Sequence, residues 1–341
     1  MTARPHRASR SLAALAVALL ACLFLGGCTL QEFPQSTLHP QGDVAREIQS
    51  LLEQLVFWVA IIFVLVQGAL IYAVVRFRAR PGAPDPKPVH GNTTLEIAWT
   101  IAPAVILALV AVPTVLTIFH TQGKPPANAL TVKVIGHQWW WEFQYPEYGV
   151  TTGSEMHVPL GRAVGVDIES ADVAHSFWLP AMAGKRDALP NHTNHLWFTA
   201  ESTGVFPGQC AELCGISHAN MRMKLVVTTK EEFERWVAVQ KSAPAEPEAG
   251  SLAATGKETF AQSACIGCHT IQGVSAGIIG PDLTHFGSRT TIAGAMFPND
   301  TEHLAKWITE PDKRKPGTLM LNLGLAPEQV TALVAYLQSL K

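Results

Sequence analysis

The sequence predicts a multidomain membrane protein: a hairpin of two transmembrane helices, then a β-sandwich or barrel, then an all-α domain. Three observations predict this fold class. Two long uncharged stretches lie in the N-terminal part of the chain, short strand-like runs follow them, and a stretch rich in Pro, Ala and Glu precedes a helical C-terminal region. With 341 residues, the chain is also too long for one ordinary domain.

The composition narrows the class of protein further. Charged residues make up 15% of the chain and hydrophobic residues 48%, which excludes a disordered or fibrous protein and favours a membrane protein. The 25 basic and 27 acidic residues give a formal net charge of -2, so we expect no nucleic acid among the partners. Six cysteines are too few for a disulfide scaffold, and their positions therefore matter more than their number.

Residues 1–28 predict an export signal peptide. Three arginines are followed by an uncharged run from Ser11 to Leu25, which is too short for a stable membrane span. The run ends in Leu25-Gly26-Gly27-Cys28. This ending resembles a bacterial lipoprotein cleavage box, which would make Cys28 the lipidated first residue of the mature chain. The alternatives are an uncleaved signal or ordinary cleavage nearby.

Two helices within residues 29–126 are expected to cross the membrane. Residues 55–75 and 97–119 are uncharged stretches of 21 and 23 residues, and at about 1.5 Å per residue each can cross about 30 Å of hydrocarbon. The positive-inside rule places the loop between them in the cytoplasm, so both ends of the mature chain lie outside the bacterial inner membrane. The basic residues of this loop are Arg76, Arg78, Arg80 and Lys87.

Two soluble domains follow, separated by a linker. Residues 127–241 contain short runs such as Leu130–Ile135, punctuated by Gly and Pro, which predict β-structure. Residues 242–250 are rich in Pro, Ala and Glu and cannot build a core. In residues 251–341, apolar side chains recur at three- and four-residue steps near the C-terminus, which predicts helices.

The segment from Cys210 to Met221 gathers five side chains of metal-binding type within twelve residues. Soft sulfur ligands combined with imidazole suit copper that carries electrons, and His175 upstream offers a second imidazole. A Cys210–Cys214 disulfide or a zinc site is the alternative, but neither accounts for Met221 at this spacing. The five side chains are Cys210, Glu212, Cys214, His218 and Met221.

This C-x-E-x-C-x3-H-x2-M pattern, preceded by an isolated His-Ser-Phe, resembles the binuclear copper A loop of subunit II of the haem-copper cytochrome c oxidases. The resemblance implies a cupredoxin-like fold for residues 127–241. It also implies a magnesium ion shared with subunit I and faced by the Glu212 side chain. The implied copper ligands are His175, Cys210, Cys214, His218, Met221 and the backbone carbonyl of Glu212.

Two further segments resemble the same family. Gly136–Phe143 is similar to the aromatic stretch beneath the copper site, where Trp139 matches the tryptophan through which electrons enter; its three consecutive tryptophans are alternatively core aromatics. Leu95–Pro103 is similar to the start of the second membrane helix, where Glu96 matches the carboxylate at the mouth of a proton path. A glutamate at a helix start is otherwise an ordinary partner of the helix dipole.

Cys265-Ile-Gly-Cys268-His269 is the c-type haem attachment motif, in which two thiols form thioethers with the haem and the histidine binds its iron. A thioredoxin-like C-x-x-C fits poorly, because no βαβ pattern surrounds it. A Met/His pair raises the iron potential as an electron carrier requires. Lys315–Met320 resembles the methionine loop of small bacterial c-type cytochromes, so Met320 is the expected second axial ligand and Met296 the alternative.

Together these features resemble subunit II of a caa-type cytochrome c oxidase from a bacterium. The resemblance implies that electrons pass from a soluble or membrane-bound cytochrome c, or a cytochrome bc complex, through haem c and copper A to subunit I. Subunit I carries haem a and the haem-copper centre, where oxygen is reduced to water and protons are pumped, and subunit III completes the complex. The chain would be one subunit of this enzyme, with the oxygen chemistry elsewhere. The alternatives are a membrane-tethered electron shuttle for another reductase and a copper-delivery protein.

Overall fold

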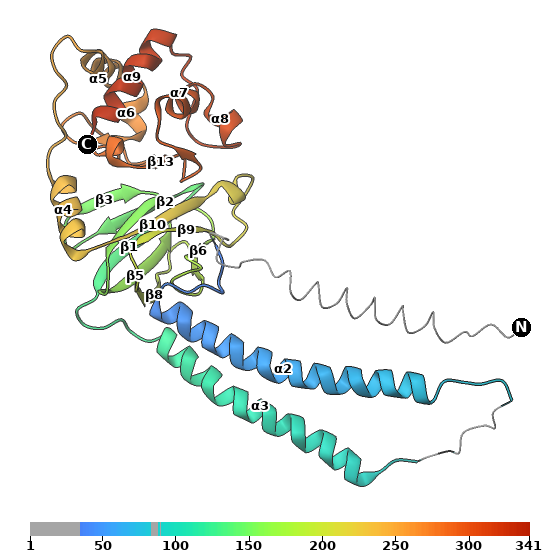
Figure 1. Cartoon of the computed structure of the whole chain (residues 1–341). Helices are drawn as coiled ribbons and strands as arrows, with labels where there is room; N and C mark the ends of the chain where they lie inside the picture. The colour runs from blue at the N-terminus through green and yellow to red at the C-terminus, as the bar shows by residue number, and fades with distance from the viewer. Residues whose placement is uncertain (1–34, 83–87, 89) are drawn as a thin grey trace, which may run out of the picture.

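The computed structural model describes residues 35–82, 88 and 90–341. Two long helices extend from one end of a β-rich part, and a small helical domain lies at the other end of that part (Figure 1). The predicted export signal and Cys28 lie outside the described residues.

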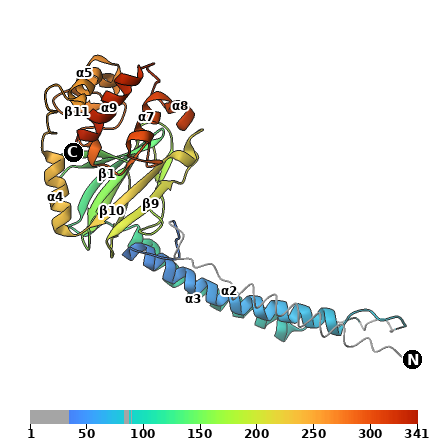
Figure 2. The ribbon, with the colours of Figure 1, turned by 45° about the horizontal axis from the view of Figure 1, so that its top comes forward.

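Helices α2 (Asp43–Arg76) and α3 (Thr93–Thr121) form an antiparallel hairpin, seen side by side in Figures 1 and 2. They contain 34 and 29 residues, and each is long and apolar enough to cross a membrane. Both helix starts are capped or anchored. The Asn92 side chain accepts a hydrogen bond from a backbone amide in the first turn of α3, and Asp43 accepts one from the amide of Thr199 (2.7 Å), which fixes α2 to the β-rich part.

The β-rich part, called here the β-domain, is a sandwich of two five-stranded sheets followed by helix α4 (Lys230–Lys241). The strand orders are β3-β2-β1-β5-β8 and β4-β10-β9-β6-β7. Strands β1 and β5 pair in parallel, as do β4 and β10, and the other neighbours are antiparallel. The strands are β1 (Leu130–His137), β2 (Trp140–Tyr145), β3 (Val150–Gly153), β4 (Glu155–Pro159), β5 (Ala163–Ser170), β6 (His175–Trp178), β7 (Arg186–Ala188), β8 (Asn194–Thr199), β9 (Gly204–Cys210) and β10 (Arg222–Thr228).

Aromatic side chains fill the core of the β-domain between the sheets. Trp141 and Phe177 pack edge to face with 5.5 Å between ring centroids, the arrangement that aromatic quadrupoles favour. The buried hydroxyl of Tyr145 donates a hydrogen bond to the carbonyl of His157 (2.9 Å) and accepts one from its amide (2.7 Å). These two hydrogen bonds join β2 of one sheet to β4 of the other, because a polar group buried without partners would be costly.

The C-terminal domain, residues 251–341, packs its first long helix across its last. Helices α5 and α9 approach closely at Gly256, where an added Cβ would lie 2.0 Å from the carbonyl oxygen of Ala332. Phe260 and Tyr336 pack edge to face beside this crossing, at 6.1 Å between centroids. The elements are α5 (Leu252–Gln262), α6 (Cys265–Cys268), β11 (Thr270–Ile271), β12 (Ser275–Ala276), η3 (Phe286–Ser288), β13 (Thr291–Ile292), β14 (Phe297–Pro298), α7 (Thr301–Thr309), α8 (Pro311–Arg314) and α9 (Pro327–Ser339).

The predicted fold class is confirmed, with one difference in the C-terminal domain. This domain is helical but also contains two ladders of two-residue strands, β11–β12 and β13–β14. Strands this short show no periodicity in a sequence. A side chain stabilises the first ladder: the Ser275 hydroxyl accepts a hydrogen bond from the amide of Ile271 (3.0 Å) and donates one to the carbonyl of His269 (2.7 Å).

We predict that Gly256→Ala destabilises the C-terminal domain, because the added methyl group would overlap backbone of α9. Overpacking of this kind costs about 1–3 kcal/mol in the free energy of unfolding. Ala261→Val, at an exposed position on α5, is the matched control and should cost less than about 0.7 kcal/mol. Hydrogen exchange of the α9 amides in the full chain measures both, and equal protection in the two variants would contradict the prediction.

Candidate functional site

The β-domain brings the predicted copper side chains together at one end of the strands β6, β9 and β10. His175 begins β6 and Cys210 ends β9, and these strands pair so that Phe177 lies opposite Cys210. Met221 directly precedes β10, and its carbonyl accepts a hydrogen bond from the amide of Cys210 (2.9 Å). The segment from Cys210 to Met221, called here the copper loop, therefore starts and ends at the same place.

Sulfur and nitrogen atoms of these side chains converge. The Sγ atoms of Cys210 and Cys214 are 3.8 Å apart, well beyond the bond length of about 2.05 Å in a disulfide, and both thiols are free. Cys210 Sγ lies 4.0 Å from Nδ1 of His175, and Cys214 Sγ lies 3.6 Å from Nδ1 of His218 and 3.9 Å from Sδ of Met221. The carbonyl oxygen of Glu212 is 3.2 Å from Cys210 Sγ.

These spacings fit metal ions shared among the donors. Two donors bound to one metal at about 2.0–2.3 Å each lie about 3.6 Å apart in a tetrahedral arrangement. His175, Cys210, Cys214 and Met221 are all buried, so water is excluded. The contact between the thiols lowers the pKa of Cys210 and raises the pKa of Cys214.

Two residues that the sequence analysis missed orient His175. Its Nε2 lies 2.7 Å from Oδ1 of Asp172, and the other carboxylate oxygen accepts a hydrogen bond from the amide of Gln138 (2.6 Å). Metal-binding histidines commonly use their second ring nitrogen in this way, which fixes the ring and its tautomer. The sequence could have indicated Asp172 as the partner of His175, because it precedes the histidine by only three residues.

Trp139 packs against the copper loop and is nearly buried. Its indole Nε1 donates a hydrogen bond to the carbonyl of Cys214 (3.0 Å), and the Gln138 side chain donates another to the same oxygen (2.7 Å). Trp141 instead belongs to the core, with its ring 5.9 Å from that of His175. One of the three tryptophans is thus a core aromatic, and Trp139 directly contacts a predicted copper ligand.

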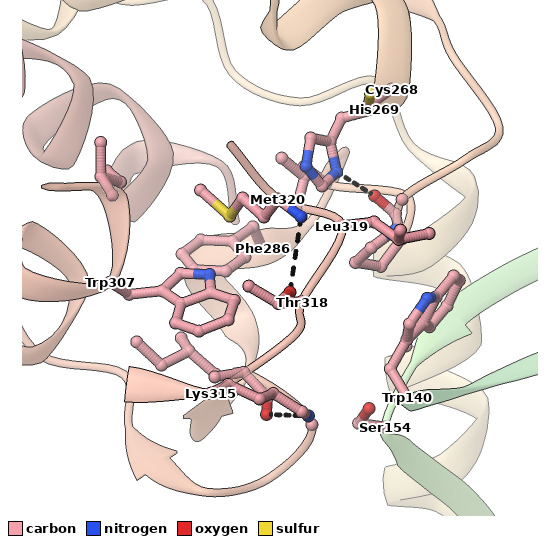
Figure 3. A pocket seen from close by; sticks show the side chains of 18 of the residues that line it. Trp140, Ser154, Cys268, His269, Phe286, Trp307, Lys315, Thr318, Leu319 and Met320 are labelled. Carbon is pink, nitrogen blue, oxygen red and sulfur yellow. Dashed lines mark hydrogen bonds between the residues drawn. The ribbon is translucent and has the colours of Figure 1, made fainter. Parts of the chain in front are cut away.

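A cavity in the C-terminal domain is lined by the predicted haem side chains Cys265, Cys268, His269 and Met320. Figure 3 shows His269 and Met320 on its walls. Among the residues that the structure describes, Met296 is not part of this lining.

His269 is prepared to bind a metal through Nε2. Its Nδ1 lies 2.8 Å from the carbonyl oxygen of Pro281. That oxygen can only accept a hydrogen bond, so Nδ1 carries the hydrogen and Nε2 of the neutral ring is left without one. Burial lowers the pKa of His269, so the ring stays neutral. Gly280 is required beside it, because a Cβ at that position would lie 2.5 Å from Cε1 of the ring. The cavity and its two thiols fit a covalently attached haem.

The β-domain completes the wall of this cavity. Trp139, Trp140, Gly153 and Ser154 line it together with residues of the C-terminal domain, and Figure 3 shows Trp140 and Ser154 facing the cavity from the green β-domain. The two predicted redox sites are therefore neighbours, with Trp139 in contact with both.

Glu96 lies apart from these sites, in the first turn of α3. Its Oε1 accepts a hydrogen bond from the amide of Asn92 (3.3 Å), and Asn92 in turn caps the helix. This hydrogen bond is the one expected of a glutamate at the start of a helix. The Glu96 side chain is also exposed at the end of a membrane helix, where a partner subunit can reach it. The Glu212 side chain is likewise exposed, on the copper loop.

Comparison with known proteins identifies all three parts of the chain. Residues 35–116 match the family model for the cytochrome c oxidase subunit II transmembrane domain, residues 150–229 that for its periplasmic domain, and residues 253–341 that for cytochrome c. The family models of these domains imply bound copper A and haem c. They also indicate that α2 and α3 anchor the chain in a membrane while the β-domain and C-terminal domain lie outside it.

Curated relatives match along nearly their whole length. Cytochrome c oxidase subunit 2 of Alkalihalophilus pseudofirmus is 40% identical over 326 residues, which cover 94% of each chain. The same subunit of Bacillus subtilis is 34% identical over 341 residues, covering 94% of this chain and 95% of the relative. A solved periplasmic domain of subunit II of cytochrome oxidase from Bradyrhizobium japonicum is 39% identical, with a TM-score of 0.33, and covers 34% of this chain and 96% of that one.

The relatives' full-length match, together with a copper loop in the β-domain and a haem cavity in the C-terminal domain, assigns the chain to its family. It belongs to the cytochrome c oxidase subunit II family, in the form whose chain continues into a cytochrome c domain.

Proposed function

We propose that this chain admits electrons to a terminal oxidase through two redox centres that its own residues hold side by side. The observation that carries this proposal is the shared position of Trp139, which contacts the copper loop and lines the haem cavity. When bound, copper A and haem c each supply a one-electron carrier for transfer toward subunit I. The chain itself supplies ligands, excludes water and fixes the distance between the two centres.

Copper is proposed to be held by His175, Cys210, Cys214, His218, Met221 and the carbonyl of Glu212. Their mutual distances of 3.2–4.0 Å support this ligand set. The ligands lie on strand ends and on a loop closed by the Cys210–Met221 backbone hydrogen bond. A scaffold that cannot move lets the ligands keep their positions during a redox change, and a small rearrangement favours fast transfer.

The haem is proposed to be attached to Cys265 and Cys268, with His269 and Met320 as axial ligands. The bare Nε2 of His269 and the position of Met320 on the cavity wall support these roles. A thioether opposite an imidazole raises the potential of a c-type haem, as suits a carrier that passes electrons onward.

The copper loop is also proposed to face subunit I. Leu213 and Ile216 are 78% and 75% exposed on it, which is unusual for large apolar side chains beside a buried site and suits a protein interface. The exposed carboxylate of Glu212 could there hold the magnesium ion that the family resemblance implies.

Further parts of this proposal concern the ends and partners of the chain. We propose that Cys28 is lipidated after export and that residues 242–250 form the linker between the two soluble domains. A cytochrome c or a cytochrome bc complex is proposed as the electron donor. α4 ends at Lys241 and α5 begins at Leu252, which supports the linker. Subunit III is proposed as a further neighbour. A separate shuttle or a copper-delivery protein is not favoured, because the match to cytochrome c oxidase subunit 2 of Alkalihalophilus pseudofirmus covers 94% of that relative.

We predict that Met221→Leu retains copper but slows oxygen uptake by the purified complex. Loss of a weak thioether ligand changes the potential of a copper centre, and a shift of about 59 mV changes a one-electron equilibrium tenfold. We therefore expect slower transfer to the copper centre and slower uptake. The matched control is Met223→Leu, a methionine that is also buried and lies two residues along, with its Cε beside Gly208. Oxygen uptake, copper content and the optical spectrum are measured on both, and normal uptake by Met221→Leu would contradict the ligand assignment.

The two methionines of the C-terminal domain can be separated directly. We predict that Met320→Ala abolishes the six-coordinate Met/His haem spectrum while Met296→Ala preserves it, because Met320 lines the cavity. The absorbance of the oxidised protein near the methionine–iron charge-transfer band measures the outcome. The reverse result, with the band lost only in Met296→Ala, would refute the assignment of Met320.

For Glu96, the matched pair is Glu96→Gln and Asn92→Ala. Glutamine keeps an acceptor for the Asn92 amide but cannot carry a proton, whereas Asn92→Ala removes the helix cap and keeps the carboxylate. If Glu96 stands at the mouth of a proton path, Glu96→Gln slows turnover at unchanged copper and haem content and Asn92→Ala does not. Unimpaired turnover in Glu96→Gln would leave Glu96 a capping residue only.

A further inference from the structure

The C-terminal domain is fixed to the β-domain by hydrogen bonds that involve two buried ionisable side chains. Figure 1 shows the domain lying against the end of the sandwich where β3, β2 and β10 are labelled, and Figure 2 shows it against the same β-rich part from another side. One of the two side chains, Glu155, comes from the β-domain, and the other, Lys315, from the C-terminal domain. Neither binds copper or haem in the function proposed above.

Glu155 is only 2% exposed, and its partners lie in the other domain. Its carboxylate accepts hydrogen bonds from the amide of Thr290 (3.0 Å), the hydroxyl of Thr290 (2.7 Å) and the hydroxyl of Thr291 (2.6 Å). A buried carboxylate without such partners is strongly unfavourable. Glu155, at the start of β4, is therefore stable in its buried position only when the C-terminal domain places Thr290 and Thr291 beside it.

Lys315 makes the complementary contact from the C-terminal domain. It is 3% exposed, and its Nζ donates hydrogen bonds to the carbonyl of Trp139 (2.5 Å) in the β-domain and to that of Ala293 (2.8 Å) in its own domain. Burial lowers the pKa of Lys315 to about 7, but an amino group has enough protons for both carbonyls in either state.

Lys315 begins the methionine loop, Lys315–Met320, and the next two residues also lie on the β-domain. The hydroxyl of Ser217, on the copper loop, donates a hydrogen bond to the carbonyl of Pro316 (2.7 Å). Gly317 has a positive φ of 77°, and a Cβ there would lie 3.0 Å from Cη2 of Trp139. The loop thus packs against the six-membered ring of the Trp139 indole.

We propose that Glu155 and Lys315 are positioning residues, which hold the C-terminal domain so that the methionine loop stays on Trp139 during electron transfer. The inference rests on the function proposed above. Each transfer moves one electron from the reduced haem to the oxidised copper centre, and neither anchor gains or loses a proton or bond. The linker keeps the two domains near each other but does not orient them. Their relative orientation determines how the haem cavity and the copper loop are aligned for electron transfer.

The test uses the complete oxidase with Glu155→Gln and Lys315→Met, singly and together. Each substitution nearly preserves the size of the side chain. The matched controls are Glu147→Gln and Lys313→Met, exposed residues that pair within their own domains. If Glu155→Gln does not assemble, Thr291→Val removes a hydroxyl donor of the same contact from the other side.

Two readouts are measured. The first is hydrogen exchange of the Arg222 amide, which donates to the carbonyl of Gly294 across the interface (3.2 Å). Loss of one anchor should speed its exchange about tenfold, and loss of both should speed it further, because the exchange rate follows the opening equilibrium. The second is the rate of electron transfer from haem to copper after flash reduction, recorded at several solvent viscosities.

We expect a viscosity-independent rate in the native complex, and a slower, viscosity-dependent rate in the double variant, whose C-terminal domain must dock again before transfer. The optical spectra of both centres should stay as in the native complex. Reduction potentials are measured in every variant, because Lys315 also lines the haem cavity, and transfer rates are compared after correction for any change in driving force. Unchanged exchange and transfer would overturn the inference. Faster exchange with unchanged transfer would overturn it while leaving the proposed function intact, whereas absence of transfer from haem to copper in the native complex would overturn both.

Discussion

The structure depends on the way Trp139 is held from two sides. Its indole nitrogen donates to the carbonyl of Cys214, and its own carbonyl accepts from Lys315 of the other domain. The first bond fixes the ring against the copper loop, and the second fixes the methionine loop against the same residue. The copper loop therefore contacts Trp139, and Trp139 in turn lines the haem cavity. Trp139 is covered on both sides only when the β-domain and the C-terminal domain have both folded.

The sequence could predict those sites whose parts lie close together in the chain. The copper loop holds five donor-type side chains in twelve residues, and the haem motif holds three in five. Spacing this tight constrains geometry before any fold is known. The membrane helices were predictable for a similar reason, because about 20 apolar residues in one helix already match the thickness of a bilayer. Their starts at Asp43 and Thr93 were less predictable, since polar residues precede the apolar stretch within each helix.

Contacts between distant segments could not be predicted in the same way. Glu155 resembles an ordinary surface residue in sequence, and Lys315 resembles a solvated lysine in a loop. Their roles depend on Thr290 and Trp139, which lie 135 and 176 residues away. The contact of Asp172 with His175 could have been predicted, because the two residues are three positions apart. The second hydrogen bond of Asp172 comes from the amide of Gln138, in the connection between β1 and β2, and could not be predicted. Each of these residues acquires its role only once the sheets have formed.

Polar anchors suit an interface that must have one geometry. Apolar surfaces can slide over one another with little change in free energy, because the hydrophobic effect has no direction. A buried carboxylate and a buried amino group cannot, because every displaced arrangement leaves a donor or acceptor without a partner. The interface between the two domains uses such groups beside Trp139 and beside β4, at two separate points. Two separate directional contacts restrict the rotation of one rigid domain on another more than a single contact does, and the Ser217–Pro316 hydrogen bond adds a third point of contact. A restricted rotation keeps the methionine loop beside Trp139, between the two centres.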